Sequence, residues 1–245
     1  MSGRGSFKGS FSPGRIPEVA LGYFWDPASG QGSAAAGFLL PEGNGKTAYN
    51  MITPSAGVAP TLTTVNGQAA VLCANANPDK NARVSGTVTR GFTGAAMIWG
   101  WISAPGPNVG VIVHHARATN NFQIQLNTSD VRVYVHDGVG SIEARFPNPT
   151  YASAPYYYEA VFDPSQSATN RMQLFVDRVQ ITPNVAGSPG TSMQDPADVM
   201  GLCSQTNDSS NFNLNGDATT GVFGITNGIP SDENRDRLFN YRRLK

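Results

Sequence analysis

Paired carboxyl groups are the first chemistry to look for, because a retaining glycosidase needs two of them about 5–5.5 Å apart. The glutamates of this chain are isolated from one another in sequence: Glu18, Glu42, Glu143, Glu159 and Glu233. The chain also lacks a Gly-x-Ser-x-Gly turn and a phosphate-binding glycine loop. We therefore predict no catalytic residue, and we expect Glu159, which lies in an aromatic run, to face solvent or a buried partner.

Side chains that could bind a metal are few. His114 and His115 are adjacent on an expected strand, so they point to opposite faces and do not share one metal ion. Segment 207–217, NDSSNFNLNGD, has the composition of a calcium loop but not its aspartate spacing or its distal glutamate. We predict no metal site and no cofactor, with calcium at this segment as the one alternative left open.

Two other residue pairs invite a chemical interpretation. Trp99 and Trp101 share one face of an expected strand, where they could form a sugar-stacking platform, but an apolar run of this kind favours a sheet core. Cys73 and Cys203 are interpreted as buried small apolar residues, and a disulfide between them needs the fold to bring them together.

Bulk composition argues against several partner classes. The 245 residues carry 17 Lys and Arg against 17 Asp and Glu, so the formal net charge is zero. Nothing global therefore favours nucleic acid, a membrane surface or a polyanionic substrate. No apolar window approaches the length of a membrane span, and the N-terminal segment lacks the apolar stretch of a secretory signal. We expect synthesis in a cytoplasm and neither a nucleic-acid nor a membrane partner.

Short strands would position any site in this chain. Segment 156–179 has two β-branched and aromatic runs, 157–162 and 172–176, around a polar loop, which predicts a hairpin. Met172, Leu174 and Val176 alternate onto one face, which we expect to enter a core.

Other segments complete an all-β pattern. Segment 30–45 is small and loop-like, and 122–126 and 131–135 are expected to be antiparallel neighbours. Segment 231–240 predicts the one helix, with a Ser231 cap and acids in its first turn. Strands are predicted at 19–25, 58–72 with a turn at Asn66-Gly67, 84–88, 95–102, 109–115, 122–126, 131–135, 141–146, 199–203 and 220–225. About a dozen strands of this kind predict a two-sheet sandwich.

The order of several motifs resembles the laminin G type of concanavalin A-like jelly rolls, including bacterial and phage members. The motifs are IPEVALGYFWD, NGQAAVL, VFD, LFVD, GVFGI and SDENRDRLFNY, and they span 16–241. Arg178 stands where that family shows glycine, and Cys73 stands where members often show an Asp/Gly-containing segment. The resemblance implies an all-β, two-sheet antiparallel jelly-roll sandwich (concanavalin A-like) with an extended N-terminal arm and one short C-terminal helix. Polysaccharide hydrolases of the group carry an E-x-D-x-E strand that this chain lacks, and the glycan-binding residues stay unknown because rim loops vary.

The N-terminal residues suggest an attachment device. Residues 1–15 are Gly/Ser-rich and cannot bury enough apolar surface to fold alone, so we expect an arm that docks either on its own domain or on another chain. The predicted division is therefore an arm over 1–15 and a single domain over 16–245. The expected assembly contacts are Phe7, Lys8, Phe11 and Arg15.

Two non-enzymatic functions fit these observations. The first is a structural or decoration protein of a tailed-phage particle, which reaches the virion after synthesis in the host cytoplasm and contacts other virion proteins or copies of itself. The second is a lectin-like module that binds host-surface glycan, which the fold favours only by analogy. A polysaccharide hydrolase is a remote third.

Overall fold

The structure of the protein is a computed structural model. It describes residues 21–25, 27, 38–40, 49–52, 61–74, 82–84, 91–103, 110–115, 122–127, 129–148, 155–196, 200–202, 217–241 and 243–245. The predicted arm at 1–15 and the calcium-loop candidate, apart from Asp217, lie outside these residues, as do Glu18, Glu42 and Cys203. The side chain of Cys73 is not described either.

Almost every element in the described part of the chain is a strand. The strands are β1 (Leu21–Trp25), β2 (Phe38–Leu40), β3 (Tyr49–Ile52), β4 (Thr61–Val65), β5 (Gln68–Ala74), β6 (Ala82–Val84), β7 (Ala96–Ser103), β8 (Gly110–His115), β9 (Phe122–Leu126), β10 (Asp130–His136), β11 (Ser141–Pro147), β12 (Tyr156–Phe162), β13 (Met172–Val176), β14 (Val179–Ile181), β15 (Met200–Leu202) and β16 (Asp217–Asn227). A 3-10 turn, Ala168–Asn170, lies in the β12–β13 loop, and α1 (Asp232–Asn240) is the α-helix.

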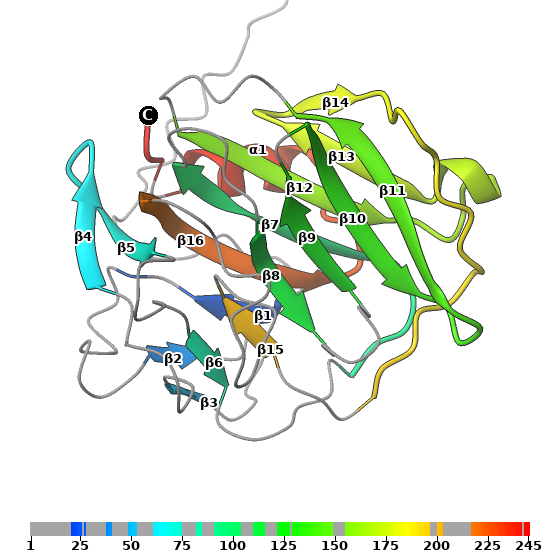
Figure 1. The fold of residues 1–245 in the computed structure, drawn as a ribbon, viewed down its shortest axis with the longest axis horizontal. Coiled ribbons are helices and arrows are strands. Elements are labelled where there is room, and N and C mark those ends of the chain that lie inside the picture. The colour runs from blue at the N-terminus through cyan, green and yellow to red at the C-terminus, as the bar shows by residue number, and fades with distance from the viewer. Residues whose placement is uncertain are drawn as a thin grey trace, which may run out of the picture.

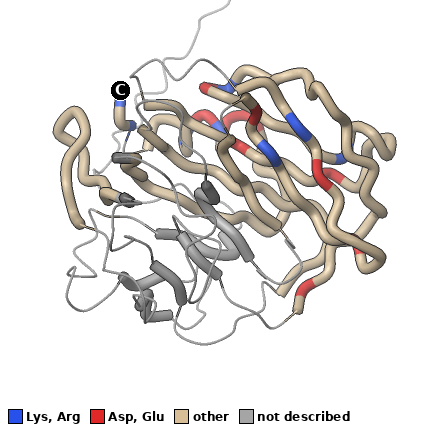
Figure 2. The backbone as a smooth tube through the Cα atoms, viewed as in Figure 1, with Lys and Arg blue, Asp and Glu red and all other residues tan. Residues whose placement is uncertain are grey.

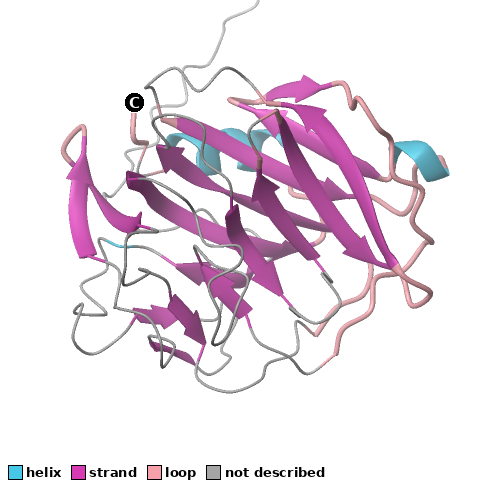
Figure 3. Cartoon of the chain, viewed as in Figure 1, coloured by secondary structure: helices cyan, strands magenta, loops and turns pink. Residues whose placement is uncertain are grey.

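The strands form two sheets that pack face to face (Figure 1). Sheet A has the order β14-β13-β12-β7-β16-β5-β4, with β1 also paired to β16. Sheet B has the order β11-β10-β9-β8-β15-β6-β3-β2. Every pairing between these strands is antiparallel. The predicted two-sheet antiparallel jelly-roll sandwich with one C-terminal helix is confirmed (Figure 3).

The main core fills the space between the two sheets. Alternate residues of β9 and β10 point inward, including Phe122, Ile124 and Val133, which are all fully buried. They meet inward residues of sheet A, among them the predicted core face of β13. A buried aliphatic or aromatic side chain of this size contributes about 1.5–3 kcal/mol, so the core accounts for most of the folding free energy.

A second apolar cluster lies on the outer face of sheet A. Trp99 and Trp101 of β7 are fully buried there, beside Tyr157 of β12. Helix α1 covers them through Leu238 and Phe239, and the Phe239 ring stacks on Trp101 at 5.4 Å between centroids. The expectation that the two tryptophans lie in a core is confirmed, although this core is between sheet and helix.

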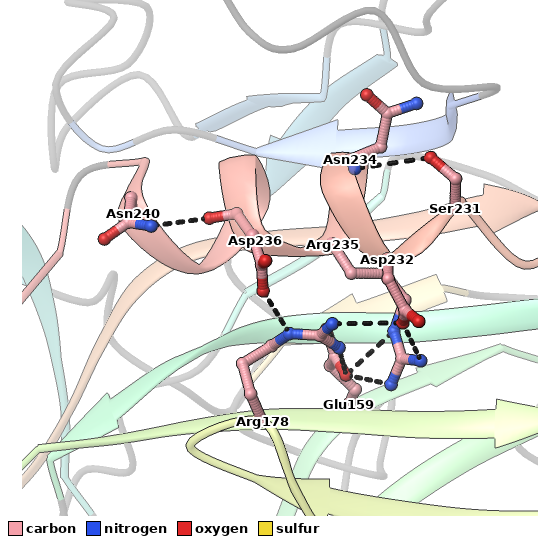
Figure 4. Close-up of polar contacts among 8 residues, drawn as sticks. All are labelled: Glu159, Arg178, Ser231, Asp232, Asn234, Arg235, Asp236 and Asn240. Carbon is pink, nitrogen blue, oxygen red and sulfur yellow. Dashed lines mark hydrogen bonds and ion pairs between the residues drawn. The ribbon is translucent and has the colours of Figure 1, made fainter. Parts of the chain in front are cut away.

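A buried ion cluster joins α1 to sheet A (Figure 4). Glu159 of β12 has no exposed surface and accepts hydrogen bonds from both Arg178 and Arg235. Arg178 also contacts Asp232 and Asp236 of the helix, at 3.2 Å and 3.0 Å. Glu159 therefore faces a buried partner, which was one of the two environments expected from the sequence.

The turn between β13 and β14 has Arg178 at a position where the backbone conformation would favour glycine. Asp177 and Arg178 have φ of 50° and 71°, the left-handed region in which glycine is usual. A non-glycine residue there costs about 1–2 kcal/mol. This backbone conformation directs the Arg178 side chain at Glu159 and at Asp236 of α1. The hydrogen bonds that its guanidinium makes there offset the strain.

Segment 182–196, which we call the strap, runs along the edge of the sandwich beside β11 (Figure 1). The amide of Arg145 donates to the carbonyl of Val185, so part of the edge strand is paired. Gly187 makes the close approach to β11, since a Cβ there would lie 2.8 Å from the Glu143 carbonyl oxygen. Asp137 in the β10–β11 turn accepts from the Gly190 amide and holds the strap at its middle.

Most predicted elements are confirmed, and one is wrong. The 157–162 and 172–176 hairpin and the antiparallel pairing of β9 with β10 are as predicted. Segment 30–45 was expected to be loop, yet β2 lies within it, because paired neighbours can hold a three-residue strand that has no pattern of its own. Of the strand expected at 84–88, the structure describes Val84, which belongs to β6, and residues 85–88 lie outside the described part of the chain.

Replacing Glu159 by glutamine should destabilise the protein by about 3 kcal/mol, because two largely buried guanidiniums lose their shared carboxylate. Urea unfolding measures this loss. The matched control is Glu233→Gln, which removes an exposed i,i+4 pair with Arg237 and should change stability by less than about 0.5 kcal/mol. Equal effects of the two substitutions would contradict the role assigned to the cluster.

Asp137→Asn should lower stability by about 1 kcal/mol at pH 7, because the Gly190 amide loses its carboxylate acceptor. Hydrogen bonds from Gly190, and then from Val139 and Gly140, hold the pKa of Asp137 below its usual value. The stabilisation is thus complete above the unfolded-state pKa of about 3.9 and is lost as the pH falls through the lower folded-state pKa. Urea titrations from pH 7 to pH 2 should show the unfolding free energies of the variant and the parent converging as the pH falls. A difference that stays constant with pH would contradict the role assigned to the Asp137 carboxylate.

Candidate functional site

The glutamates that the structure describes lie in three different environments. Glu143 lies on the outer face of sheet B, Glu159 lies on the outer face of sheet A, and Glu233 is exposed on α1. The two sheets separate Glu143 from Glu159, so these two glutamates do not form a catalytic pair. The assembly contacts expected at Phe7, Lys8, Phe11 and Arg15 lie outside the described residues.

A set of polar side chains covers the outer face of β9, β10 and β11, opposite the main core. The strand register aligns Gln125 with Arg132 and Arg145 in one row, and Gln123 with Tyr134 and Glu143 in the next. We call this set the polar array, and it is completed by residues at the end of the strands. Its members are Gln123, Gln125, Asn127, Asp130, Arg132, Tyr134, Glu143 and Arg145.

Hydrogen bonds between side chains run across the whole array. On β9, Gln123 donates to Gln125 at 3.4 Å, and Gln125 donates to Asn127 at 3.1 Å. Asn127 then donates to Asp130 Oδ1 at 3.0 Å, and the same oxygen accepts from Arg132 Nε at 2.9 Å. Side chains two apart on a strand share a face, so the alternation of apolar and polar residues along β9 and β10 places these hydrogen-bonded side chains in one row.

The β10–β11 half of the array is built from ion pairs. Arg132 Nη1 lies 3.7 Å from Glu143 Oε2, and Arg145 Nε donates to Glu143 Oε1 at 2.7 Å. Figure 2 shows both signs of charge interspersed over β10 and β11. Two carboxylates and two guanidiniums give the array a formal charge of zero.

Tyr134 lies at the centre of the array, opposite Glu143 on one side and Gln123 on the other. Burial raises the pKa of Tyr134, and Glu143 raises it further while Arg132 opposes the change. The half-buried phenol therefore stays neutral over the physiological range and keeps its proton.

Exposure falls steadily across the array. The side chain of Arg145 at the sheet edge is 41% exposed, whereas those of Arg132 and Glu143 are 27% and 28% exposed. Gln123 on β9 is fully buried, and its Oε1 has no hydrogen-bond partner among the described residues. The array is thus most exposed at Arg145 and ends at an unsatisfied buried acceptor, a group whose burial costs about 1–3 kcal/mol.

Searches of the described residues for a metal-ligand cluster and for a membrane-spanning helix found neither. Within the described ranges, no three His, Cys, Asp or Glu side chains lie together in a way that could hold a metal ion. Of the helices that the structure describes, none is long and apolar enough to cross a membrane. In the polar array, planar amide, guanidinium and carboxylate groups lie side by side and are joined by hydrogen bonds.

Known proteins share the fold of this chain but not its sequence. No family model and no curated protein matches it. The binding domain of Paraclostridial Mosquitocidal Protein 1 is similar with a TM-score of 0.57 and 9% identity. The binding domain of botulinum neurotoxin DC is similar with TM-scores of 0.59 in its complex with SialylT and 0.58 in its complex with rat synaptotagmin II, both at 11% identity.

These similarities cover nearly all of this chain and half of the other proteins. The covered shares are 91%, 91% and 92% of this chain but only 51%, 52% and 52% of the three others. The chain thus spans about half the length of those domains, and at such low identity the likeness shows the β-sandwich fold.

Sequence reasoning missed the polar array, although a signal for it was present. Strands 122–126 and 131–135 alternate cleanly, and their outward positions carry Gln123, Gln125, Arg132 and Tyr134. The outward positions of an ordinary solvated strand do not need so many planar hydrogen-bonding side chains, so their presence was a signal. The sequence alone does not give the strand register, which places Glu143 and Arg145 beside them.

Proposed function

We propose that this protein is a non-catalytic carbohydrate-binding module and that the polar array is its binding surface. The observation that carries the proposal is the continuous network of planar polar side chains on the outer face of β9–β11. Sugars are recognised by such groups, because each hydroxyl both donates and accepts a hydrogen bond. The structural neighbours support the proposal, since one of them is a binding domain in complex with SialylT.

The chemistry of the array favours binding over hydrolysis. Asp130 and Glu143 flank the same guanidinium, that of Arg132. A glycosidase needs one carboxyl group that delivers a proton to the leaving group. Two ion-paired carboxylates are suited instead to accepting hydrogen bonds from ligand hydroxyls.

Arg132→Ala should abolish saturable glycan binding, because the Arg132 guanidinium pairs with both Asp130 and Glu143 and holds their side chains in place. A glycan array probed with the intact chain, followed by titration of the best ligand, measures the effect. The matched control is Arg237→Ala on α1, which lies over the other sheet and should bind as the parent does. Thermal unfolding confirms that both variants are folded. No saturable binding by the parent to any glycan, or undiminished binding by Arg132→Ala, would overturn the proposal.

We also propose that the module belongs to a tailed-phage particle, where residues 1–15 attach it and the sandwich is displayed. The support comes from the sequence: the Gly/Ser-rich arm with Phe7 and Phe11, the near absence of net charge, and the resemblance to phage-encoded sandwiches. Attachment through the arm is compatible with glycan binding by the displayed sandwich. The two functions can therefore operate on one virion.

Removing residues 1–15 should leave a folded protein that no longer joins its particle. The two sheets and the core between them are built from residues 21–227, so the unfolding midpoint should stay within a few degrees of the parent value. Incorporation into particles, measured on purified virions by immunoblotting, should be lost. Retained incorporation would contradict attachment through the arm.

A further inference from the structure

We infer that the polar array selects neutral glycans, those without carboxylate or sulfate groups. This inference rests on the proposed carbohydrate-binding function and names its ligand class. It is carried by the charge balance of the array and by the donors and acceptors that its internal hydrogen bonds leave free.

The charges of the array are already paired within it. Asp130 is paired with Arg132 at 2.9 Å, and Glu143 Oε1 accepts from Arg145 Nε at 2.7 Å. Glu143 also lies 3.7 Å from Arg132. An anionic ligand at either guanidinium would lie beside a carboxylate that is already paired with it and would be repelled by that carboxylate, so neither guanidinium is an unneutralised anion site.

The free hydrogen-bonding positions are of both kinds. Asp130 accepts its hydrogen bonds at Oδ1, and its Oδ2 has no partner among the described residues. Arg145 binds Glu143 through Nε and Nη2, and within the same set of residues its Nη1 donates to no acceptor. A sugar hydroxyl can donate to the first and accept from the second, whereas a carboxylate or sulfate can only accept.

The part of the array that a ligand can reach lies on β10 and β11, because Gln123 and Gln125 of β9 are buried. Between Arg132 and Glu143 lies the neutral Tyr134 hydroxyl, whose pKa is raised by burial. The array therefore offers both acceptors and donors and carries no net charge.

Direct titration with two sets of polysaccharides tests this inference. The neutral probes are dextran, laminarin, galactomannan and arabinoxylan, and the acidic probes are hyaluronate, polygalacturonate, heparin and polysialic acid. We expect saturable binding to at least one neutral probe, changing less than about two-fold between 50 mM and 500 mM NaCl, because no net charge is neutralised. Acidic probes should bind at least ten-fold more weakly.

Two substitutions at the free positions locate the binding. Asp130→Asn and Arg145→Ala should each weaken binding to the neutral probe by ten-fold or more, whereas Glu233→Gln on α1 should leave it unchanged. The Arg145 side chain is more exposed than that of Asp130, so we expect Arg145→Ala to stay folded. It therefore tests the inference even if Asp130→Asn unfolds. Preferred binding to an acidic probe that weakens with salt would overturn the inference while leaving carbohydrate binding intact. Binding to none of the eight probes and to no glycan on the array would overturn both.

Discussion

The structure depends on how the outer face of sheet A is buried. That face carries Trp99, Trp101 and Tyr157, which would form a large exposed aromatic patch if nothing covered them. Helix α1 provides the cover, and the buried carboxylate of Glu159 holds the helix in place through Arg178 and Arg235. Replacing a buried ion pair by apolar side chains is often neutral or stabilising, so this cluster is not needed for stability alone. We infer that it fixes the position at which α1 docks on sheet A.

Burial of that face determines which surface is left for function. With α1 on sheet A, the paired tryptophans are structural and are unavailable for stacking on a sugar. The outer face of β9–β11 has the opposite character, since its side chains are polar, hydrogen-bonded to one another and exposed toward the β11 edge. One sandwich thus has an aromatic face that stabilises it and a polar face that can bind a ligand.

The sequence predicted the architecture well, because alternation and turn chemistry are local signals. The hairpin around 163–171, the pair 122–126 and 131–135, and the Ser231-capped helix were all visible in the pattern of residues. The short strands β2 and β14 were missed, since three residues carry no period and depend on their neighbours.

The candidate site could not be predicted in the same way. Glu159 was identified as a residue of interest, but its partner Arg235 is 76 positions away and is brought to it by the packing of α1. The polar array needs the register of three strands, which places Glu143 opposite Tyr134 and Arg145 opposite Arg132. Arg178 was noticed only as a departure from glycine, and its φ of 71° together with its ion pairs explains why that departure is tolerated.

The most direct test of the account is to observe the arginine side chains themselves while a glycan binds. The Nε–H resonances of Arg132 and Arg145 can be followed by NMR during titration with an oligosaccharide of the best ligand. Those of Arg178 and Arg235, on the opposite side of the sandwich, serve as internal references. The account predicts saturable shifts for Arg132 and Arg145 and none for Arg178 and Arg235. Shifts confined to Arg178 and Arg235, or saturable binding that leaves all four resonances unmoved, would contradict it.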